Sequence, residues 1–254
     1  MLSVERQERI VEELNKKGTI KVSELSKKLH VTEKTIRMDL EILESDGFLK
    51  RVHGGAVLPT GDDDILPIKE RQAKFHKEKR LLAKEALHRI VPGDTILLDG
   101  GSTTSELADL LGDYPVTVIT NDIKIANILL EKDKVELLVI GGTKIGSSSS
   151  LVGSTPAKML EGIHVNQFFV GSTGVDLNNG LTVFNSLHAD WKRQIMTRAR
   201  KTTLLADSTK FGKTALIQFA SLKEVDEVIT DSKLDPMIKK GLEEASIHLT
   251  IVDF

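Results

Sequence analysis

The residues of this sequence that could do chemistry gather where short apolar runs end. The first cluster is Asp99-Gly100-Gly101-Ser102-Thr103-Thr104, and leucines at helical spacing follow it. Glycines let a backbone approach a bound molecule closely, and hydroxyls with free N–H groups at a helix start bind an anion such as phosphate. An ordinary strand-to-helix turn capped by Ser and Thr uses the same residue types. This cluster alone therefore leaves both interpretations open.

Four further polar clusters each follow an apolar run. They are Thr120-Asn121, Gly141-Gly142, Gly171-Ser172-Thr173-Gly174-Val175-Asp176 and Ala206-Asp207-Ser208-Thr209-Lys210. The loops that follow the strands of a parallel sheet converge at one edge, where ligands bind. Together the clusters favour a small phosphorylated polyol or sugar. We expect its anion near Ser102, where the helix dipole favours negative charge, with Lys210 adding positive charge and Asp176 accepting hydrogen bonds from sugar hydroxyls.

A second set of candidate residues lies on a helix predicted over residues 33–46. Its apolar stripe consists of Ile36, Leu40 and Leu43, at about 100° per residue. Lys34 and Met38 point away from that stripe, and Thr35 and Arg37 flank it. The outward face at the start of a recognition helix meets DNA base edges. Lys and Arg suit guanine or phosphate, and Met38 suits a thymine methyl group.

The elements around this helix follow the order of a winged helix-turn-helix. We expect helices over 4–17 and 24–30, capped by Ser3 and Ser23, with a short strand from Ile20 to Val22 between them. Gly18 should end the first helix. Thr32 should cap the third helix and Gly47 should end it.

Residues 48–57 predict a strand, a Gly-Gly turn and the start of another strand. Arg51 and His53 on this wing are placed for contact with the DNA backbone or minor groove. A small three-helix domain with a solvated charged face is the alternative. Two capped helices separated by a tight turn, followed by a basic wing, favour DNA binding instead.

The pattern changes beyond the linker expected at residues 59–68. A long helix is expected at 69–91, before Pro92-Gly93. Short apolar runs then alternate with helical segments, which predicts a mostly parallel α/β sheet covered by helices. The predicted strands are Thr95–Leu98, Val116–Thr120, Val135–Ile140, Gln167–Val170, Thr202–Ala206, Val225–Thr230 and Ile247–Val252.

Composition excludes several classes of protein. The absence of cysteine excludes disulfides, thiolate metal sites and cysteine nucleophiles. There is no run of about 18 apolar residues, and the charged start does not fit a secretory signal, so a cytoplasmic protein without a membrane span is expected. The histidines are scattered without metal-ligand spacing, and neither a metal nor a cofactor is expected.

The overall net charge of the sequence gives little support for DNA binding. The formal net charge is −2, and residues 1–58 hold 11 Lys and Arg against 10 Asp and Glu. A DNA-binding domain with this balance must place a few cations well.

Several motifs of the sequence together resemble those of a known family. Thr35-Ile36-Arg37-Met38-Asp39-Leu40, Leu43-Glu44, Gly47, Leu49, Arg51 and His53-Gly54-Gly55-Ala56 resemble the DeoR family of bacterial regulators. The likeness continues through Lys79, residues 99–104, Thr120-Asn121, Gly141-Gly142, Gly174, Asp176, Gly180-Leu181-Thr182, Lys192 and residues 207–210. It implies a winged helix-turn-helix domain at 1–58, with the helix-turn-helix itself at 20–39. It also implies a domain at 69–254 that is similar in fold to ribose-5-phosphate isomerase and senses a phosphorylated sugar.

The residue patterns and the resemblance together give the candidate sites. The candidate DNA-binding residues are Thr32, Lys34, Thr35, Arg37, Met38, Arg51 and His53. The candidate effector-binding residues are Asp99, Gly101, Ser102, Thr103, Thr104, Thr120, Asn121, Gly141, Gly142, Gly174, Asp176, Lys192, Asp207 and Lys210. The expected partners are double-stranded operator DNA, a phosphorylated sugar and further copies of this chain, as a homodimer or homotetramer. Repression of a carbohydrate-metabolism operon is the family's usual role.

Three departures from the family pattern bear on function. Met38 stands where the family usually has a second arginine, and glutamates usual around Leu187 and His188 are absent. The main alternative function is an aldose–ketose isomerase, which needs a carboxylate base against the carbon proton. By resemblance that base would directly precede Lys192, where this chain has Trp191. A phosphosugar-binding module whose N-terminal domain contacts protein is a second alternative.

Overall fold

The computed structural model describes residues 2–45, 49–57, 75–144, 148–153, 159–160 and 162–253. The chain divides into two compact units, Met1–Arg71 and Gln72–Phe254. The expected linker at 59–68 and the expected helix end at Gly47 lie outside the described residues.

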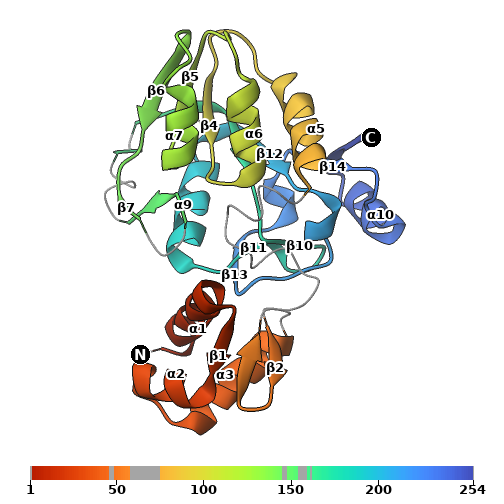
Figure 1. Cartoon of the computed structure of the whole chain (residues 1–254). Coiled ribbons are helices and arrows are strands. Elements are labelled where there is room, and N and C mark those ends of the chain that lie inside the picture. The colour runs from red at the N-terminus through yellow and green to blue at the C-terminus, as the bar shows by residue number, and fades with distance from the viewer. Residues whose placement is uncertain are drawn as a thin grey trace. The chain divides into compact units, whose positions relative to one another are not determined.

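The N-terminal unit contains three helices and a small antiparallel sheet. The helices are α1 (Ser3–Lys17), α2 (Val22–Leu29) and α3 (Glu33–Ser45), and the strands are β1 (Thr19–Lys21), β2 (Lys50–Val52) and β3 (Gly55–Val57). The strands pair antiparallel in the order β1-β3-β2. Figure 1 shows this unit in red to orange. The predicted element order of a winged helix-turn-helix is confirmed.

The helix boundaries of this unit differ from prediction at two caps. Gly18 ends α1 in the left-handed conformation (φ 71°) as expected, and the Thr35 backbone N–H donates to Thr32 Oγ1 at 3.2 Å. The prediction that Ser3 and Ser23 cap the first two helices is wrong. Each lies inside its helix, because α1 and α2 begin after Leu2 and Lys21, which have extended backbones and make no side-chain cap.

The described strands of the larger unit include a seven-stranded sheet in which every neighbouring pair is parallel, in the order β15-β14-β12-β9-β4-β5-β6. We call it the large sheet. Its strands are β4 (Thr95–Leu98), β5 (Val116–Thr120), β6 (Val135–Val139), β9 (Val165–Val170), β12 (Ala199–Leu205), β14 (Glu227–Asp231) and β15 (His248–Val252). All the strands predicted from apolar runs are found here, with ends shifted by up to three residues.

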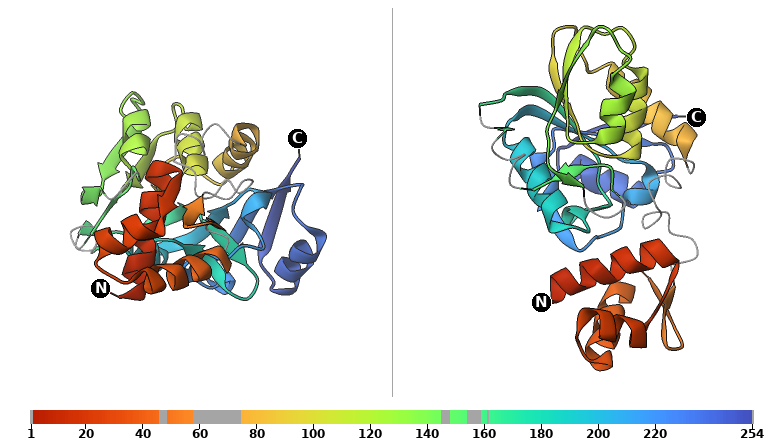
Figure 2. Two further views of the ribbon diagram at one scale, coloured as in Figure 1. Left: turned by 60° about the horizontal axis from the view of Figure 1, so that its bottom comes forward. Right: turned by 60° about the vertical axis from the view of Figure 1, so that its left-hand side comes forward.

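Helices cover both faces of the large sheet. One face packs against α5 (His76–Leu87), α6 (Ser102–Leu110) and α7 (Ile123–Leu129), through a core that includes Leu82, Leu107 and Ile125. These three helices lie side by side in Figure 1. The other face packs against α9 (Ser186–Met196) and α10 (Pro236–Glu244), and the right-hand view of Figure 2 shows helices on both sides of the sheet.

Strands that the sequence did not predict complete this second layer. A small antiparallel sheet is formed by β10 (Gly174–Asp176), β11 (Gly180–Val183) and β13 (Ile217–Ala220). A two-stranded ribbon joins β7 (Thr143–Lys144) and β8 (Leu151–Val152). The segment that holds Gly174 and Asp176 was expected to be a loop, and it is a strand and a hairpin turn.

Within the described residues, the helix predicted at 69–91 runs from His76 to Leu87. Residues 69–74 lie outside the described part, and Phe75 has a left-handed backbone (φ 55°) that precedes the first helical residue, His76. The helix ends at Leu87, where His88 to Ile90 form turns.

Among the described residues, we find no helix that is both long enough and apolar enough to span a membrane.

Candidate functional site

The exposed face of α3 carries the predicted DNA contacts. Ile36, Leu40 and Leu43 are buried, whereas Lys34, Arg37 and Met38 are exposed, Met38 by 56 %. The outward face therefore presents two cations and one thioether. Arg37 pairs with Glu33 one turn earlier at 2.6 Å, so its guanidinium is already held against a carboxylate on the same face.

The orientation of α3 is fixed from its buried side. Asp39 is buried, and its carboxylate accepts hydrogen bonds from Arg6 of α1, with Nε at 2.5 Å and Nη2 at 2.9 Å. The carboxylate of Asp39 also accepts from Gln7 Nε2 at 3.4 Å. This ion pair joins the first and third helices, and the sequence analysis did not identify it.

The wing is a tight hairpin whose turn requires glycine. Gly54 has φ 81°, and a Cβ at Gly55 would lie 2.0 Å from the Ile20 carbonyl oxygen. His53 in this turn is exposed. Arg51 is exposed too, but its guanidinium and backbone N–H both bind Glu44 of α3.

The carboxyl ends of the strands bring several of the predicted effector residues together. Asp99 follows β4, and its Oδ2 accepts hydrogen bonds from Lys192 Nζ of α9 and, at 3.3 Å, from Gly171 N after β9. Lys192 Nζ also donates to the Gly171 carbonyl oxygen at 2.9 Å. Asp99 is 3 % exposed and Lys192 is 5 % exposed, so this is a buried ion pair. Both residues hold the edge of the sheet together through contacts within the protein.

Hydroxyl groups of the first cluster fasten the β4–α6 turn. Thr104 Oγ1 donates to the Asp99 carbonyl oxygen at 2.6 Å, and Ser105 Oγ donates to the Gly101 carbonyl oxygen at 2.7 Å. Thr120 Oγ1 of the next strand donates to the Leu98 carbonyl oxygen at 2.8 Å. The hydroxyl of Thr104 therefore stabilises the turn itself, as expected for an ordinary strand-to-helix turn. The hydroxyl of Thr120 stabilises the end of β4 in the same way.

The start of α6 keeps features of an anion site. Gly101 precedes the helix with an extended backbone and makes no side-chain cap. The first N–H groups of a helix have no partner within the helix. The Ser102 and Thr103 backbones lie at this start, Ser102 being half-buried and Thr103 9 % exposed.

The β5–α7 turn adds a second polar cluster beside the first. Asn121 is fully buried, and its Nδ2 donates to the Leu151 carbonyl oxygen at 2.8 Å. Its Oδ1 is also buried and has no hydrogen-bond partner among the described residues. A ligand hydroxyl is a group that would satisfy such an acceptor.

Asp122 organises the same turn, and the sequence analysis missed it. Its Oδ1 caps α7 through Lys124 N and Ile125 N, and its Oδ2 accepts from the hydroxyls of Ser149 and Ser150 at 2.7 and 3.1 Å. A Cβ at Gly100 would lie 1.8 Å from Ser150 Oγ, so only glycine fits there. The position of Asp122, directly after the Thr120-Asn121 pair, was the available signal.

The loop after β12 contains Asp207 and Lys210. Asp207 accepts from Thr209 N at 3.1 Å, and Lys210 N donates to the Asp207 carbonyl oxygen at 3.0 Å in a short 3-10 turn. Burial raises the pKa of the Asp207 carboxyl above its ordinary value, while the Thr209 hydrogen bonds and the charge of Lys79 oppose that rise. Lys79 lies on α5, is 5 % exposed and was not among the predicted site residues.

The remaining predicted residues divide into two kinds. Gly141 is half-buried with open space where a Cβ would lie, and Gly142 is exposed, so a ligand can approach both. At Gly174 a Cβ would lie 2.5 Å from the Lys213 carbonyl oxygen. The absence of a side chain there makes room for the backbone at Lys213 and not for a ligand. Asp176 Oδ1 accepts from the backbone N–H groups of Asn178 and Asn179, which shapes the β10–β11 turn.

Trp191 occupies the position expected for an isomerase base. Its side chain is 3 % exposed and belongs to the core beneath α9, and its Nε1 is buried with no hydrogen-bond partner among the described residues. Asp190 is exposed and pairs with Arg193 at 2.9 Å. Neither residue offers a buried carboxylate to a substrate.

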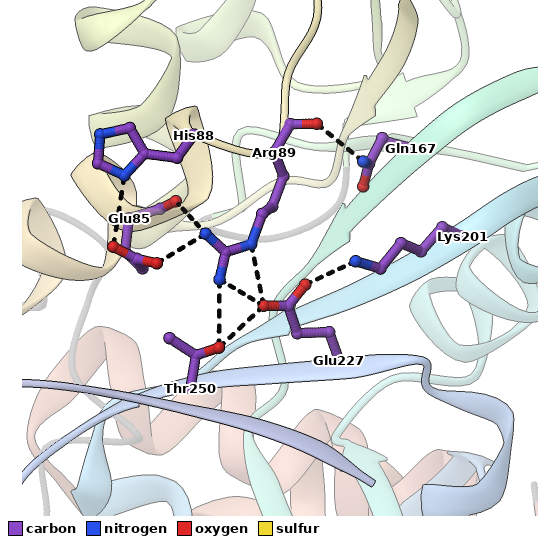
Figure 3. Close-up of polar contacts among 7 residues, drawn as sticks. All are labelled: Glu85, His88, Arg89, Gln167, Lys201, Glu227 and Thr250. Carbon is purple, nitrogen blue, oxygen red and sulfur yellow. Dashed lines mark hydrogen bonds and ion pairs between the residues drawn. The ribbon is translucent and has the colours of Figure 1, made fainter.

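A second buried ionic cluster joins α5 to the large sheet at the amino ends of its strands. Glu227 is fully buried and binds Arg89 and Lys201, each at 2.7 Å, and the Thr250 hydroxyl at 3.0 Å (Figure 3). Burial alone would raise the pKa of Glu227, but the hydrogen bonds from Arg89, Lys201 and Thr250 lower it to about 2. This cluster is structural, because its charges are satisfied within the protein.

Comparison with known proteins assigns a family to each part of the chain. Residues 6–61 match the DeoR-like helix-turn-helix domain, and residues 74–232 match the DeoR C-terminal sensor domain. The HTH-type transcriptional regulator YulB of Bacillus subtilis is 40 % identical over 252 residues, which cover 99 % of this chain and 98 % of that protein.

Relatives with named operons extend the comparison. The lactose phosphotransferase system repressor of Staphylococcus epidermidis is 32 % identical, covering 91 % of this chain and 93 % of its own. The L-fucose operon activator of Haemophilus influenzae is 33 % identical, covering 95 % and 97 %. Ribose 5-phosphate isomerase A from Methanocaldococcus jannaschii is a distant structural match, with 18 % identity, a TM-score of 0.42 and coverage of 55 % and 56 %, from which we draw no conclusion about function.

Proposed function

Because this chain belongs to the DeoR family of DNA-binding transcriptional regulators, we propose that it represses a carbohydrate operon and is released by a phosphorylated sugar. The protein is a regulator and not an enzyme, since its close relatives are transcriptional regulators with the same two domains. The lactose repressor among the relatives supports repression. Because the relatives also include the L-fucose operon activator, activation of the operon is the alternative to be tested against repression.

The DNA-binding part of the proposal rests on the exposed face of α3. Lys34, Arg37 and Met38 point outward from a helix whose other side is buried and braced by Asp39. A recognition helix placed in the major groove presents such a face to base edges. His53, exposed on the wing, lies outside this helix, where contact with the DNA backbone would add affinity.

The ligand-binding part rests on the carboxyl edge of the large sheet. The uncapped start of α6, the unpartnered acceptor of Asn121 and the open glycines after β6 all belong to turns that follow β4, β5 and β6, which neighbour one another. The N–H groups of Ser102 and Thr103 would bind the phosphate, and Lys210 would add charge. Asp99, Lys192, Asp207 and Asp176 would act by holding these turns in place, since their side chains bind within the protein.

One experiment tests the proposal as a whole. The full chain is used to enrich binding duplexes from a random DNA pool, and the enriched duplex is then titrated with phosphorylated sugars and with the corresponding neutral sugars. We expect a sequence-specific duplex that is released by a phosphorylated sugar only. Enrichment of no duplex would contradict DNA recognition, and release by neutral sugars alone would contradict the anion site.

The oligomeric state follows from the same reasoning. One helix-turn-helix covers one half-site, so we propose a homodimer or homotetramer acting on a palindromic operator in the cytoplasm. The symmetry of the enriched duplex and the mass of the protein in solution test this directly.

A further inference from the structure

Glu44 of α3 hydrogen-bonds to the wing. Its Oε1 accepts a hydrogen bond from the Arg51 backbone N–H at 2.7 Å, and its Oε2 accepts from Arg51 Nε at 2.5 Å. Glu41 Oε1 lies 3.7 Å from Arg51 Nη1. One carboxylate thus binds both the main chain and the side chain of a wing residue.

The position of β2 explains why this contact matters. β2 is an outer strand of the wing sheet and pairs with β3 on one side, Arg51 lying opposite Ala56. The N–H group that binds Glu44 therefore lies on the open edge of the strand, where a backbone donor needs another partner. Glu44 supplies that partner from the recognition helix.

The exposed ion pair between Glu33 and Arg37 lacks this property. Glu33 and Arg37 are four residues apart on one helix and pair at 2.6 Å, so their contact stays within α3. Glu44 and Arg51 are seven residues apart and belong to different elements. Loss of the Glu44–Arg51 pair would therefore loosen the wing from α3, whereas loss of the Glu33–Arg37 pair would not.

We propose that Glu44 is a positioning residue that fixes the wing against the recognition helix, with Arg51 as its brace. In this role Arg51 does not bind a DNA phosphate. His53, exposed at the hairpin turn, is then the wing residue that meets the DNA backbone in register with α3. The inference rests on DNA binding through α3 and the wing, as proposed above.

The two roles of Arg51 predict opposite effects of removing Glu44. If Glu44 positions the wing, Glu44→Ala and Arg51→Ala each weaken binding to the enriched duplex about tenfold, which is the loss of a charge-assisted hydrogen bond. The double variant is then no weaker than either single variant, because both remove one unit. If Arg51 instead binds phosphate, Arg51→Ala weakens binding to all sequences and lowers the salt slope by about 1. Glu44→Ala then strengthens binding by freeing a cation, and that result would overturn the proposal.

Two further variants sharpen the comparison. Glu44→Gln keeps an acceptor for the Arg51 N–H but loses the charge, so we expect partial recovery relative to Glu44→Ala. Glu5→Ala is the matched control, because it removes an exposed carboxylate that pairs with Arg9 within α1, away from the contact between α3 and the wing. It should not weaken binding to the enriched duplex.

Hydrogen exchange on the full-length protein without DNA provides an independent measurement. In Glu44→Ala, backbone amides of residues 50–52 should exchange faster while those of α1 keep the wild-type rate, which also shows that the domain is folded. Unchanged exchange at 50–52 would contradict the brace even if DNA binding fell. If the wild-type chain enriches no duplex, the proposed function fails, whereas faster exchange in the variant still supports the positioning role.

Discussion

Asp99 and Lys192 are 93 residues apart, yet their side chains meet at the carboxyl edge of the large sheet. Taking either partner away leaves the other buried and charged, which typically costs about 3–5 kcal/mol. We therefore expect Lys192→Met to lower the free energy of unfolding by about 3–5 kcal/mol in urea denaturation. Lys240→Met is the control, since Lys240 is exposed and pairs with Glu244 within one helix, and its change should stay within about 0.5 kcal/mol. Equal losses for the two variants would show that the buried pair does not anchor the edge.

Arg37 is the side chain on α3 that best suits base recognition. If it reads a guanine, Arg37→Ala costs about 1–3 kcal/mol on the enriched duplex and relaxes specificity at one position. If it contacts phosphate, binding weakens equally on all sequences. Gel-shift titrations of Arg37→Ala and Lys34→Ala measure both effects, with Lys239→Ala in the larger unit as the control. Unchanged affinity in both α3 variants would place the recognition surface elsewhere.

From the sequence we could predict which edge of the sheet carries the polar residues, but not what each polar side chain binds. Asp99, Asp176 and Asp207 were predicted as ligand contacts, and in the structure their carboxylates accept hydrogen bonds from groups of the protein. A carboxylate that shapes a turn and one that binds a hydroxyl have the same spacing from the preceding strand. Asp122 and its partners Ser149 and Ser150 escaped prediction, because the contact joins segments 27 and 28 residues apart.

The length and apolar character of each strand decided whether it could be predicted from the sequence. Inner strands of the large sheet such as β4 and β5 are buried along most of their length and have nearly continuous apolar sequences, such as Thr95–Leu98. β10 and β11 are three and four residues long and are rich in glycine, threonine and aspartate. Such residues favour turns, and β11 finds its second partner in β13, more than 30 residues later. Local pattern alone could not identify this small sheet.

Helix α5 is fixed at both ends by charged contacts. Near its start, Glu78 pairs with Lys233 at 3.1 Å, and Lys79 lies in the field of Asp207. After its end, Arg89 binds Glu227. Leu82, Ala83 and Ala86 are buried between these anchors. The helix is therefore packed into the core of the larger unit and held there by ion pairs at both ends.

The Glu227 anchor predicts a specific response to pH. Its folded-state pKa of about 2 lies below the ordinary 4.5, so the charged form is stabilised by folding. This contribution, up to about 3 kcal/mol, is complete above pH ~4.5 and is lost as pH falls toward about 2. Urea denaturation between pH 5 and 2.5 should show wild type losing stability more steeply than Glu227→Gln, which lacks the titrating group. Parallel curves for the two proteins would contradict the assignment.

The whole molecule combines two units that recognise different partners. A ligand changes DNA binding only through a difference in its affinity for two states of the protein. Allosteric couplings are typically about 1–3 kcal/mol, so the effector should lower the protein's affinity for DNA roughly 5–150-fold. DNA should lower the affinity for the effector by the same factor. Calorimetry of the phosphorylated sugar with and without the enriched duplex measures both directions.

Lys210→Ala distinguishes the anion site from the coupling. We expect this variant to lose affinity for the phosphorylated sugar while keeping its affinity for DNA, because Lys210 belongs to the larger unit. Intact phosphate affinity would show that the anion lies elsewhere. A ligand that binds tightly and leaves DNA affinity unchanged would show that the two units are not coupled.

Trp191, the sole tryptophan of the sequence, also gives the protein a built-in optical probe. Its indole is buried on α9, next in sequence to the lysine that holds Asp99. Its fluorescence emission should therefore be blue-shifted in the folded protein and should move to longer wavelength when the larger unit unfolds. The winged domain contributes no tryptophan signal, so melting curves recorded by emission follow the sensor unit alone, and those recorded by circular dichroism follow both. The difference between the two curves separates the stabilities of the two halves without any label.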